Sequence, residues 1–330
     1  MIRYVLKLLS GLLLAIVLVA VVSTLICWPR GTGLIGSFPR VVLWSRLHAE
    51  TAAVPTRSHP SSAEVEKAFS PWRPLDSGAV CEPGRARIGL RSYLSLSAAG
   101  KALRDGETLE ICSGRYREVI DVRASGVTLV GRGTVILEPP EDLRMAAIVL
   151  RGEGALVKNL ECRYMEVADA NGACVRLVGS GLTLQHVYFH SSQQGLLTSH
   201  KPGLVKILDS RFENLGHGGR AHGVYMGRGR LEVRGSQFLA MKNGGHAIKS
   251  RAMETVIEDS VIAEFSSHGS RLLDISDGGH LTVRRSLLQH GKASDNWEAI
   301  GYGLESSDNP GQIIELHDNV FLLERGLLAG

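Results

Sequence analysis

The sequence is poor in aromatic residues and nearly balanced in charge. Only 5% of its 330 residues are Phe, Trp or Tyr, whereas 38 residues are glycine and 44% are apolar. This balance favours a narrow core of Val, Leu and Ile interrupted by turns. The net charge of +4 is too small to create a strong general field for nucleic acid, and no nucleic-acid motif is present. The sequence therefore predicts no nucleic-acid partner.

Cysteine is also scarce, and its spacing argues against a structural zinc site. The chain has 5 cysteines, with no CxxC pair and no Cys/His cluster of the kind that holds zinc. Cys81, Cys112, Cys162 and Cys174 would lie outside the cytoplasm if the chain is exported, where disulfides can form. Three pairings are possible and the residues do not choose between them. A Cys81–Cys112 bond would tie the entry segment to the first coil, but some of the four would equally fit as small buried residues. We predict no metal and no cofactor.

Charge is absent from one stretch, residues 8–28, which is long enough to cross a bilayer as a helix. Arg3 and Lys7 precede it, so the positive-inside rule leaves the N-terminus in the cytoplasm and exports the rest. No small-residue cleavage site follows, which favours an uncleaved anchor over a signal peptide. We predict a single-pass inner-membrane anchor in residues 1–29 and a membrane-proximal linker in residues 30–75, with a short helix near residues 63–69. Residues 76–330 would form a domain on the periplasmic or extracytoplasmic side.

Helical periodicity is missing from most of this domain, and a repeat stands in its place. One short phrase of apolar, polar and small residues occurs seven times between Leu156 and Phe321. Its fourth residue stands at positions 160, 187, 210, 236, 260, 286 and 319, so the steps are 27, 23, 26, 24, 26 and 33. A period in the twenties indicates a solenoid, and short alternating runs between Gly, Asn and Ser indicate strands and turns. The sequence thus predicts an all-β parallel β-helix, with residues one period apart lying about 4.8 Å from each other. Residues 93–104 have helical spacing and would cap its open N-terminal end.

The entry to the solenoid carries a family resemblance. It reads Gly-Glu-Thr-Leu-Glu-Ile at residues 106–111 and Gly-Arg-Tyr at residues 114–116. With the repeats that end in Ser or Asn, this resembles the pectate-lyase-like right-handed parallel β-helix superfamily over roughly residues 92–324. The resemblance implies a hydrogen-bonded ladder at the small polar turn position, and we interpret those residues as structural. They are Ser210, Ser236, Ser260, Ser286 and Asn319.

A second strand in each coil gives the candidate site. We align these strands on inward residues, and the next position in each strand then points outward. The inward residues are taken as Val175, Leu197, Val224, Ile248 and Leu273. The outward row is then Arg176, Thr198, Tyr225, Lys249 and Asp274. A sixth strand is expected over residues 301–305.

Two further rows accompany the outward row. His222, His246 and Arg271 stand three residues before it, and Arg251 and Ser276 stand two residues after it. Because neighbouring coils are in contact, the sequence predicts that these side chains meet on one patch. The predicted patch contains His222, Tyr225, His246, Lys249, Arg251, Arg271 and Asp274, with Glu305 nearby.

The patch has the chemistry to act on an acidic polysaccharide. Positive side chains would neutralise a uronate carboxylate and so acidify the adjacent C–H, which is the obstacle in β-elimination and C5 epimerisation. A base must then take the proton and an acid must protonate the leaving oxygen, and His and Lys can be tuned to these tasks. We assign His246 or Lys249 as base, Tyr225 or His222 as acid, and Arg251 as carboxylate clamp. Enzymes of the resembling superfamily that act on pectate or alginate use comparable basic residues.

Other functions fit the same residues. An outward charged row can be a solvated face of cross-strand pairs, and the protein can be a non-catalytic carbohydrate-binding or scaffold protein of the cell envelope. A glycoside hydrolase would need two opposed carboxylates, for which Asp274 and Glu305 are candidates, with Asp277 close by. A metal site from His222, His246 and Asp274 is conceivable, but the spacing is not diagnostic.

Overall fold

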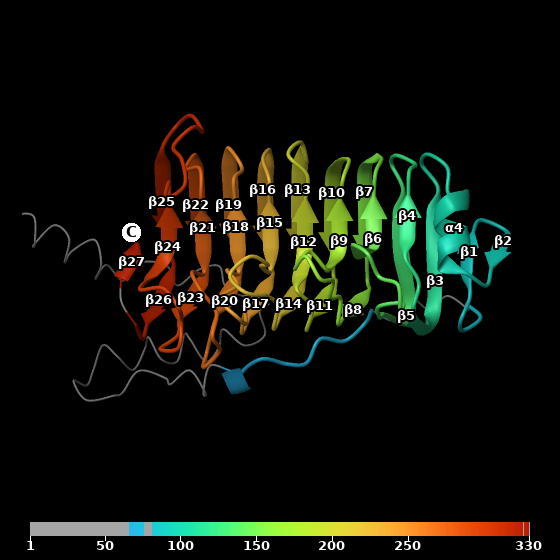
Figure 1. Ribbon diagram of the computed structural model, residues 1–330, viewed down its shortest axis with the longest axis horizontal. Helices are drawn as coiled ribbons and strands as arrows, with labels where there is room; N and C mark the ends of the chain where they lie inside the picture. The colour runs from blue at the N-terminus through green and yellow to red at the C-terminus, as the bar shows by residue number, and fades with distance from the viewer. Residues whose placement is uncertain (1–65, 76–80, 326, 330) are drawn as a thin grey trace, which may run out of the picture. The chain divides into compact units, whose positions relative to one another are not determined.

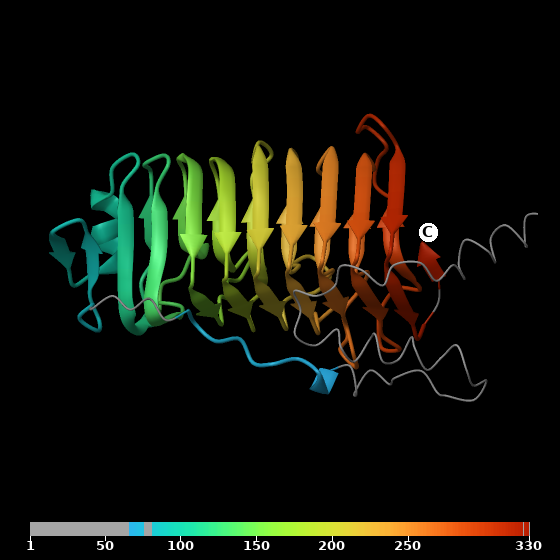
Figure 2. The same ribbon diagram turned by 180° about the vertical axis from the view of Figure 1, so that it is seen from behind.

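Successive copies of the repeat lie on top of one another as the coils of a parallel β-helix (Figure 1, Figure 2). The computed structural model describes residues 66–75, 81–325 and 327–329, all within the unit formed by residues 58–330. The predicted all-β solenoid is therefore confirmed. The predicted anchor, residues 8–28, lies outside the described residues. No helix among the residues that are described has the length and apolar character to span a membrane.

Each full coil contributes three strands, and strands of the same kind pair in parallel along the axis. The first row contains β3 (Thr108–Tyr116), β5 (Thr128–Leu137), β7 (Glu153–Lys158), β10 (Ser180–Gln185), β13 (Leu204–Leu208), β16 (Arg230–Arg234), β19 (Glu254–Glu258), β22 (His280–Arg284) and β25 (Ile313–His317). The second row contains β8 (Glu161–Arg163), β11 (Tyr188–His190), β14 (Arg211–Glu213), β17 (Gln237–Leu239), β20 (Val261–Ala263), β23 (Leu287–His290) and β26 (Val320–Leu323). The third row contains β4 (Ile120–Val122), β6 (Ala146–Leu150), β9 (Ala173–Leu177), β12 (Gln194–Thr198), β15 (Val224–Met226), β18 (Ile248–Ser250), β21 (Leu273–Ile275), β24 (Glu298–Tyr302) and β27 (Leu327–Ala329). The third row forms a separate nine-stranded sheet, which we call the third-row sheet.

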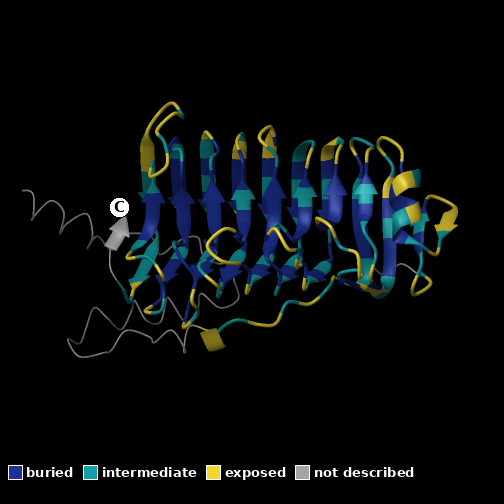
Figure 3. Ribbon diagram, viewed as in Figure 1, coloured by how far each residue is buried: buried dark blue, intermediate teal, exposed yellow. Residues whose placement is uncertain are grey.

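The pairing register agrees with the repeat read from the sequence. Ile207 pairs with Leu184 in the coil before it and with Val233 in the coil after it. Inward side chains of equivalent positions stack into an apolar core. Figure 3 colours most residues of these strands as buried. The rings of Phe212 and Phe238, one period apart, stack with centroids 4.8 Å apart. The uneven steps therefore reflect loop length, because the strands themselves stay in register.

The predicted ladder runs along the turn between the first and second rows. The backbone N–H of Ser210 donates to Ser236 Oγ at 3.1 Å, Ser236 N–H donates to Ser260 Oγ at 3.2 Å, and Ser260 N–H donates to Ser286 Oγ at 3.1 Å. Asn319 ends the series by accepting from Ser286 N–H at 3.0 Å. Each serine hydroxyl also donates to the carbonyl two residues before it. The ladder thus satisfies buried backbone groups, as a structural role requires.

The N-terminal end is capped, although by a shorter helix than predicted. α4 covers Leu96–Ala102, whereas residue 93 belongs to β2 (Arg91–Tyr93), which pairs with β1 (Ala86–Ile88). Ser95 is the N-cap and accepts from Ala98 N–H, so the helix starts at Leu96, three residues after β2 ends. A Cβ on Gly100 would come within 2.9 Å of Ile120 Cγ2 in β4. Glycine at this position therefore permits the helix to lie close against β4, the strand that begins the third row.

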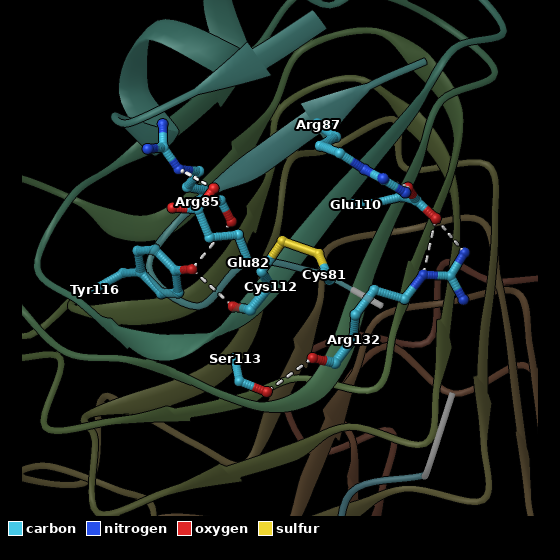
Figure 4. Close-up of a disulfide and its surroundings, with 9 residues drawn as sticks. All are labelled: Cys81, Glu82, Arg85, Arg87, Glu110, Cys112, Ser113, Tyr116 and Arg132. Carbon is cyan, nitrogen blue, oxygen red and sulfur yellow. Dashed lines mark hydrogen bonds and ion pairs between the residues drawn. A yellow bond between two sulfur atoms is a disulfide. The ribbon is translucent and has the colours of Figure 1, made fainter. Parts of the chain in front are cut away.

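Two disulfides form among the four described cysteines, Cys81–Cys112 and Cys162–Cys174. The first ties the entry segment to β3, which was one of the pairings left open (Figure 4). Tyr116, from the Gly-Arg-Tyr entry, lies beside it and donates to the carbonyl of Cys112 at 2.6 Å. Burial raises the pKa of Tyr116 to about 12, so its hydroxyl remains a donor.

The described part of the predicted linker packs on the solenoid. Residues 66–75 run along the second row (Figure 1), where Leu75 exchanges hydrogen bonds with Asn159 and Trp72 stacks on Tyr188 with ring centroids 5.7 Å apart. Earlier in the same segment, the Ser70 carbonyl accepts a hydrogen bond from the Arg211 side chain. These contacts show that the described part of the segment lies against the β-helix, and the boundary at residue 76 stays a prediction. Helical residues of the predicted helix near residues 63–69 are described at Glu66 and Lys67.

Candidate functional site

The candidate site lies on the outward face of the third-row sheet, over β15, β18, β21 and β24. Tyr225 pairs with Lys249 and Lys249 pairs with Asp274, as the alignment predicted. Asp274 in turn pairs with Gly301. Three of the predicted outward residues therefore occupy consecutive rungs.

Two positions of the alignment are wrong. Leu196, not Leu197, pairs with both Val175 and Val224, so Leu196 points inward and Leu197 takes the outward position assigned to Thr198. Two consecutive leucines made the alternation ambiguous there. The sixth strand is β24, Glu298–Tyr302, and Glu305 lies in the loop after it rather than in a strand over residues 301–305.

The two histidines form a ladder of their own at the start of these strands. His222 and His246 stack with ring centroids 4.9 Å apart. His222 Nδ1 accepts the N–H of His246 at 3.1 Å, and His246 Nδ1 accepts the N–H of Arg271 at 3.1 Å. Burial, together with the nearby charge of Lys249, holds the pKa of His222 well below its usual value. His222 is therefore neutral at physiological pH.

Asp274 is the buried centre of the site. His246 Nε2 lies 3.0 Å from Asp274 Oδ2, and Ser276 donates to Oδ1 at 2.7 Å. Lys249 Nζ and Arg271 Nη1 each lie 3.6 Å from Oδ2. Burial alone would raise the pKa of Asp274, but the hydrogen bond from His246, with the charge of Lys249, lowers it. The carboxylate is therefore ionised.

Glu305 lies on the solvent side of two cations. Its Oε1 accepts from Lys249 Nζ at 2.5 Å, and its Oε2 accepts from Arg251 Nη2. The Glu305 side chain is 44% exposed, against 10% for Lys249 and 23% for Arg251. Burial would raise the pKa of Glu305, but the hydrogen bonds from Lys249 and Arg251 lower it. One carboxylate thus spans both cations.

Arg251 also connects the site to Tyr225. Its Nε donates to Tyr225 Oη at 3.0 Å, and its Nη1 lies 2.5 Å from Asp277 Oδ1. Burial opposes the charge, yet the hydrogen bonds with Tyr225 and Glu305 raise the pKa of Arg251. Because Arg251 is the donor in the contact with Tyr225, the phenolic hydrogen stays available for donation to a ligand.

All eight predicted site residues are thus brought together. We call the group, with the two carboxylates that join it, the ionic cluster. It comprises His222, Tyr225, His246, Lys249, Arg251, Arg271, Asp274, Asp277, Glu298 and Glu305. Glu298, which pairs with Arg271 at 3.4 Å, was missed because the sixth strand was placed too late in the sequence.

The cluster is not the basic patch that was expected. Among the described residues it holds three basic side chains, Lys249, Arg251 and Arg271, against four carboxylates. Every cation already has a carboxylate partner. The excess of basic residues counted along the strands disappears once Asp277, Glu298 and Glu305 are in place.

The bonding pattern narrows the possible chemical roles. His246 has no free lone pair, because Nδ1 accepts from Arg271 N–H and Nε2 carries the hydrogen directed at Asp274. That leaves Lys249 of the two bases considered. A glycoside hydrolase needs one carboxylic acid with a raised pKa, whereas the pKa values of Asp274 and Glu305 are both lowered. Within the described part of the chain, no group of three or more His, Cys, Asp or Glu residues is arranged to hold a metal ion.

Comparison with known proteins gives one structural likeness. No family model matches the chain. No characterised protein matches it by sequence. A solved structure, the crystal structure of pectate lyase Pel9A, is similar over 71% of this chain and 72% of that chain, with 15% sequence identity and a TM-score of 0.45. The parallel β-helix predicted from the sequence is confirmed by the strand pairing, and the resemblance to the pectate-lyase-like superfamily stays a prediction. The likeness says nothing about the ionic cluster.

Proposed function

We propose that this protein binds an acidic polysaccharide on the outward face of the third-row sheet, with Lys249 and Arg251 as the site for a uronate carboxylate. One observation carries the proposal. The two oxygens of a single carboxylate, that of Glu305, are held by these two cations, with Tyr225 bonded to the same guanidinium. A sugar carboxylate has the same shape and charge as this group, and arginine suits its geometry.

A purely structural role accounts poorly for so many buried charges. Removing ions from water is expensive, and a buried ion pair is often no more stabilising than apolar residues of similar size. The same outward row holds Val149 and Leu197 in earlier coils, both buried, so the fold does not require charge at this position. Ionisable groups with shifted pKa values in such clusters are frequently functional.

The site also has the groups for β-elimination, which makes a lyase the second candidate. Arg251 would hold the carboxylate, and neutral Lys249 would remove the proton at C5. Electrons from that C–H bond would form the C4–C5 double bond as the C4–oxygen bond breaks, and Tyr225 would donate its proton to the leaving oxygen. Lys249 would first have to release its ammonium proton to solvent as the substrate takes the place of Glu305. If the C4–oxygen bond instead stayed intact, the electron pair would remain at C5 as a carbanion, and its reprotonation from the opposite face would give epimerisation.

We further propose that the domain works outside the cytoplasm, tethered to the cell inner membrane by residues 8–28. Two disulfides among the described residues support an oxidising compartment. The uncharged segment and the positive residues before it support the tether. Labelling Cys-free and wild-type chains with a membrane-impermeant thiol reagent, before and after reduction, tests the side on which the domain lies.

The function is tested by screening the full-length protein against pectate, alginate and glycosaminoglycans. Retention of an acidic polymer, but not of a neutral polymer of similar length, supports binding. New ultraviolet absorbance from unsaturated sugar ends would establish elimination, and its absence with retained polymer would leave a binding protein. K249M/E305Q removes a cation together with its exposed partner, so the net charge of the cluster does not change. The double variant should lose binding, and unchanged affinity would contradict the proposed site.

A further inference from the structure

The last coil contains a long loop that reaches back over the site. In three preceding coils the connection from the third row to the first row spans only residues 227–229, 251–253 and 276–279, whereas after β24 it spans residues 303–312. This insertion accounts for the step of 33 in the repeat. Figure 1 shows the loop at the top of β25, beyond the short turns of the other coils.

The 303–312 loop is attached to earlier coils by its backbone and by Asn309. The N–H groups of Glu305 and Ser306 both donate to the Ser276 carbonyl, at 3.0 Å and 3.1 Å. Asn309 Nδ2 lies 3.3, 3.1 and 3.2 Å from the carbonyls of Arg251, Ala252 and Gly278. These contacts aim Glu305 at Lys249 and Arg251 from the solvent side.

The cluster does not need Glu305 for charge balance. Without it, the cations Lys249, Arg251 and Arg271 face the carboxylates Asp274, Asp277 and Glu298, which is an even count. Lys249 keeps Asp274 at 3.6 Å and Arg251 keeps Asp277 at 2.5 Å. Glu305 is also the most exposed carboxylate of the group, at 44%. Glu305 can therefore leave while every buried cation keeps a carboxylate partner. Loss of the buried carboxylate of Asp274 would instead leave buried cations without compensation.

We infer that Glu305 is a resident carboxylate that occupies the uronate site in the free protein and is exchanged for the carboxylate of a bound sugar. This inference rests on the proposed function and adds to it that binding opens the 303–312 loop. Exchange of one carboxylate for another leaves the charge of the cluster unchanged. Affinity for the sugar is then reduced by the fraction of time that Glu305 holds the site.

The test compares binding of a galacturonate trimer to full-length wild type and to E305Q by calorimetry. The amide keeps the size of the side chain but removes its charge, so the loop should release the cations more easily. If Glu305 holds the site about nine-tenths of the time, E305Q should bind about tenfold more tightly. The matched control is E254Q, which makes the same change at a carboxylate that is paired with Arg230 on the first row and does not belong to the ionic cluster. E254Q should bind as wild type does.

A second variant reaches the same state by another route. N309A keeps the Glu305 charge but removes the side chain that attaches the loop to three carbonyls, so it should also tighten binding, by about threefold. Hydrogen exchange at the amides of Glu305 and Ser306 should speed up in wild type when the trimer is added.

The outcomes separate the two claims. Equal or weaker binding by E305Q, with no change in loop exchange, overturns the exchange of carboxylates and leaves the uronate site standing. Failure of the trimer to bind wild type, E305Q and N309A overturns the uronate site itself. Tighter binding by both variants, with E254Q unchanged, supports the inference.

Discussion

The β-helix contains two ladders of side chains, one of serines and one of histidines, and both accept hydrogen bonds from backbone N–H groups of neighbouring coils. In the serine ladder, from Ser210 to Asn319, hydroxyl and amide oxygens accept buried N–H groups of neighbouring coils. In the histidine ladder, His222 and His246 accept the N–H groups of the following coils through Nδ1. Both series stabilise successive coils, and both follow the period of the sequence.

The difference lies in what remains after the backbone is satisfied. A serine hydroxyl of the ladder accepts a hydrogen bond from a backbone N–H of the neighbouring coil, and it donates its hydrogen to the carbonyl two residues earlier in its own coil. An imidazole has a second nitrogen, and in His246 that nitrogen meets the buried carboxylate of Asp274. The histidine ladder therefore supports an ionic cluster while it performs a structural task. A residue type that recurs at every coil indicates a structural role. Positions where the residue type changes from coil to coil, as at Lys249 and Asp274, indicate a binding or catalytic site.

The largest effect is expected where the cluster loses its central anion. D274N leaves His246, Lys249 and Arg271 facing a neutral amide, so the free energy of unfolding should fall by about 3–5 kcal/mol. Urea unfolding at pH 7 measures this. The control is D259N, which alters a more exposed pair with Arg285 and should lower stability by no more than about 1 kcal/mol. A D274N loss as small as that of D259N would mean that the cluster is not held by Asp274.

The same carboxylate predicts a dependence on acid. Its pKa is lower in the folded protein than the unfolded value of about 3.9, so its contribution is present above that pH and is lost as pH falls through the folded pKa. The stability difference between wild type and D274N should therefore stay constant above about pH 5 and shrink below about pH 4. A difference that grows in acid would contradict this charge assignment.

An intermediate effect is expected in the histidine ladder. H222A leaves the N–H of His246 without its acceptor and removes a stacked ring, which should lower stability by about 1–3 kcal/mol. The folded pKa of His222 is depressed, so unfolding takes up a proton and wild-type stability should decline as pH falls below about 6.5. H222A should lack that part of the pH dependence. Identical slopes in wild type and H222A between pH 5 and 7 would exclude His222 as its source.

The smallest of these effects is expected in the serine ladder. S260A deprives the N–H of Ser236 of its acceptor, for a loss of about 1–2 kcal/mol. Because Ser260 lies on a different turn of the coil from the cluster, uronate binding should stay at the wild-type level. A matching loss of binding in S260A would remove the distinction between the two ladders, since both would then act only through stability.

The repeat made most of the fold predictable, because one period fixes which residues become neighbours. It placed Tyr225, Lys249 and Asp274 on consecutive rungs, and it placed His222 over His246. The alignment of strands failed at Leu196 and Leu197, because either of two adjacent leucines can take the inward position of a strand.

Features outside the repeat were harder to predict. Strand β24 was shifted because Glu298–Tyr302 lacks a marker residue shared with the earlier coils, and Glu298 was missed with it. The packing of residues 66–75 also escaped prediction, because an extended segment that contacts several coils through single side chains has no periodicity of its own. The contacts of Glu305 with Lys249 and Arg251 depend on the fold-back of the 303–312 loop, which lies outside the repeat and has no period to predict it.

The central claim is that Lys249 and Arg251 form a carboxylate site for an acidic polysaccharide. Its most direct test is equilibrium binding of a galacturonate trimer and of its methyl ester to the full-length wild type and to K249M/E305Q. We predict saturable binding of the acid by wild type, at least about tenfold weaker binding of the ester, and loss of that preference in the double variant. Equal affinity of folded wild type for acid and ester, or no binding of either, would contradict the account.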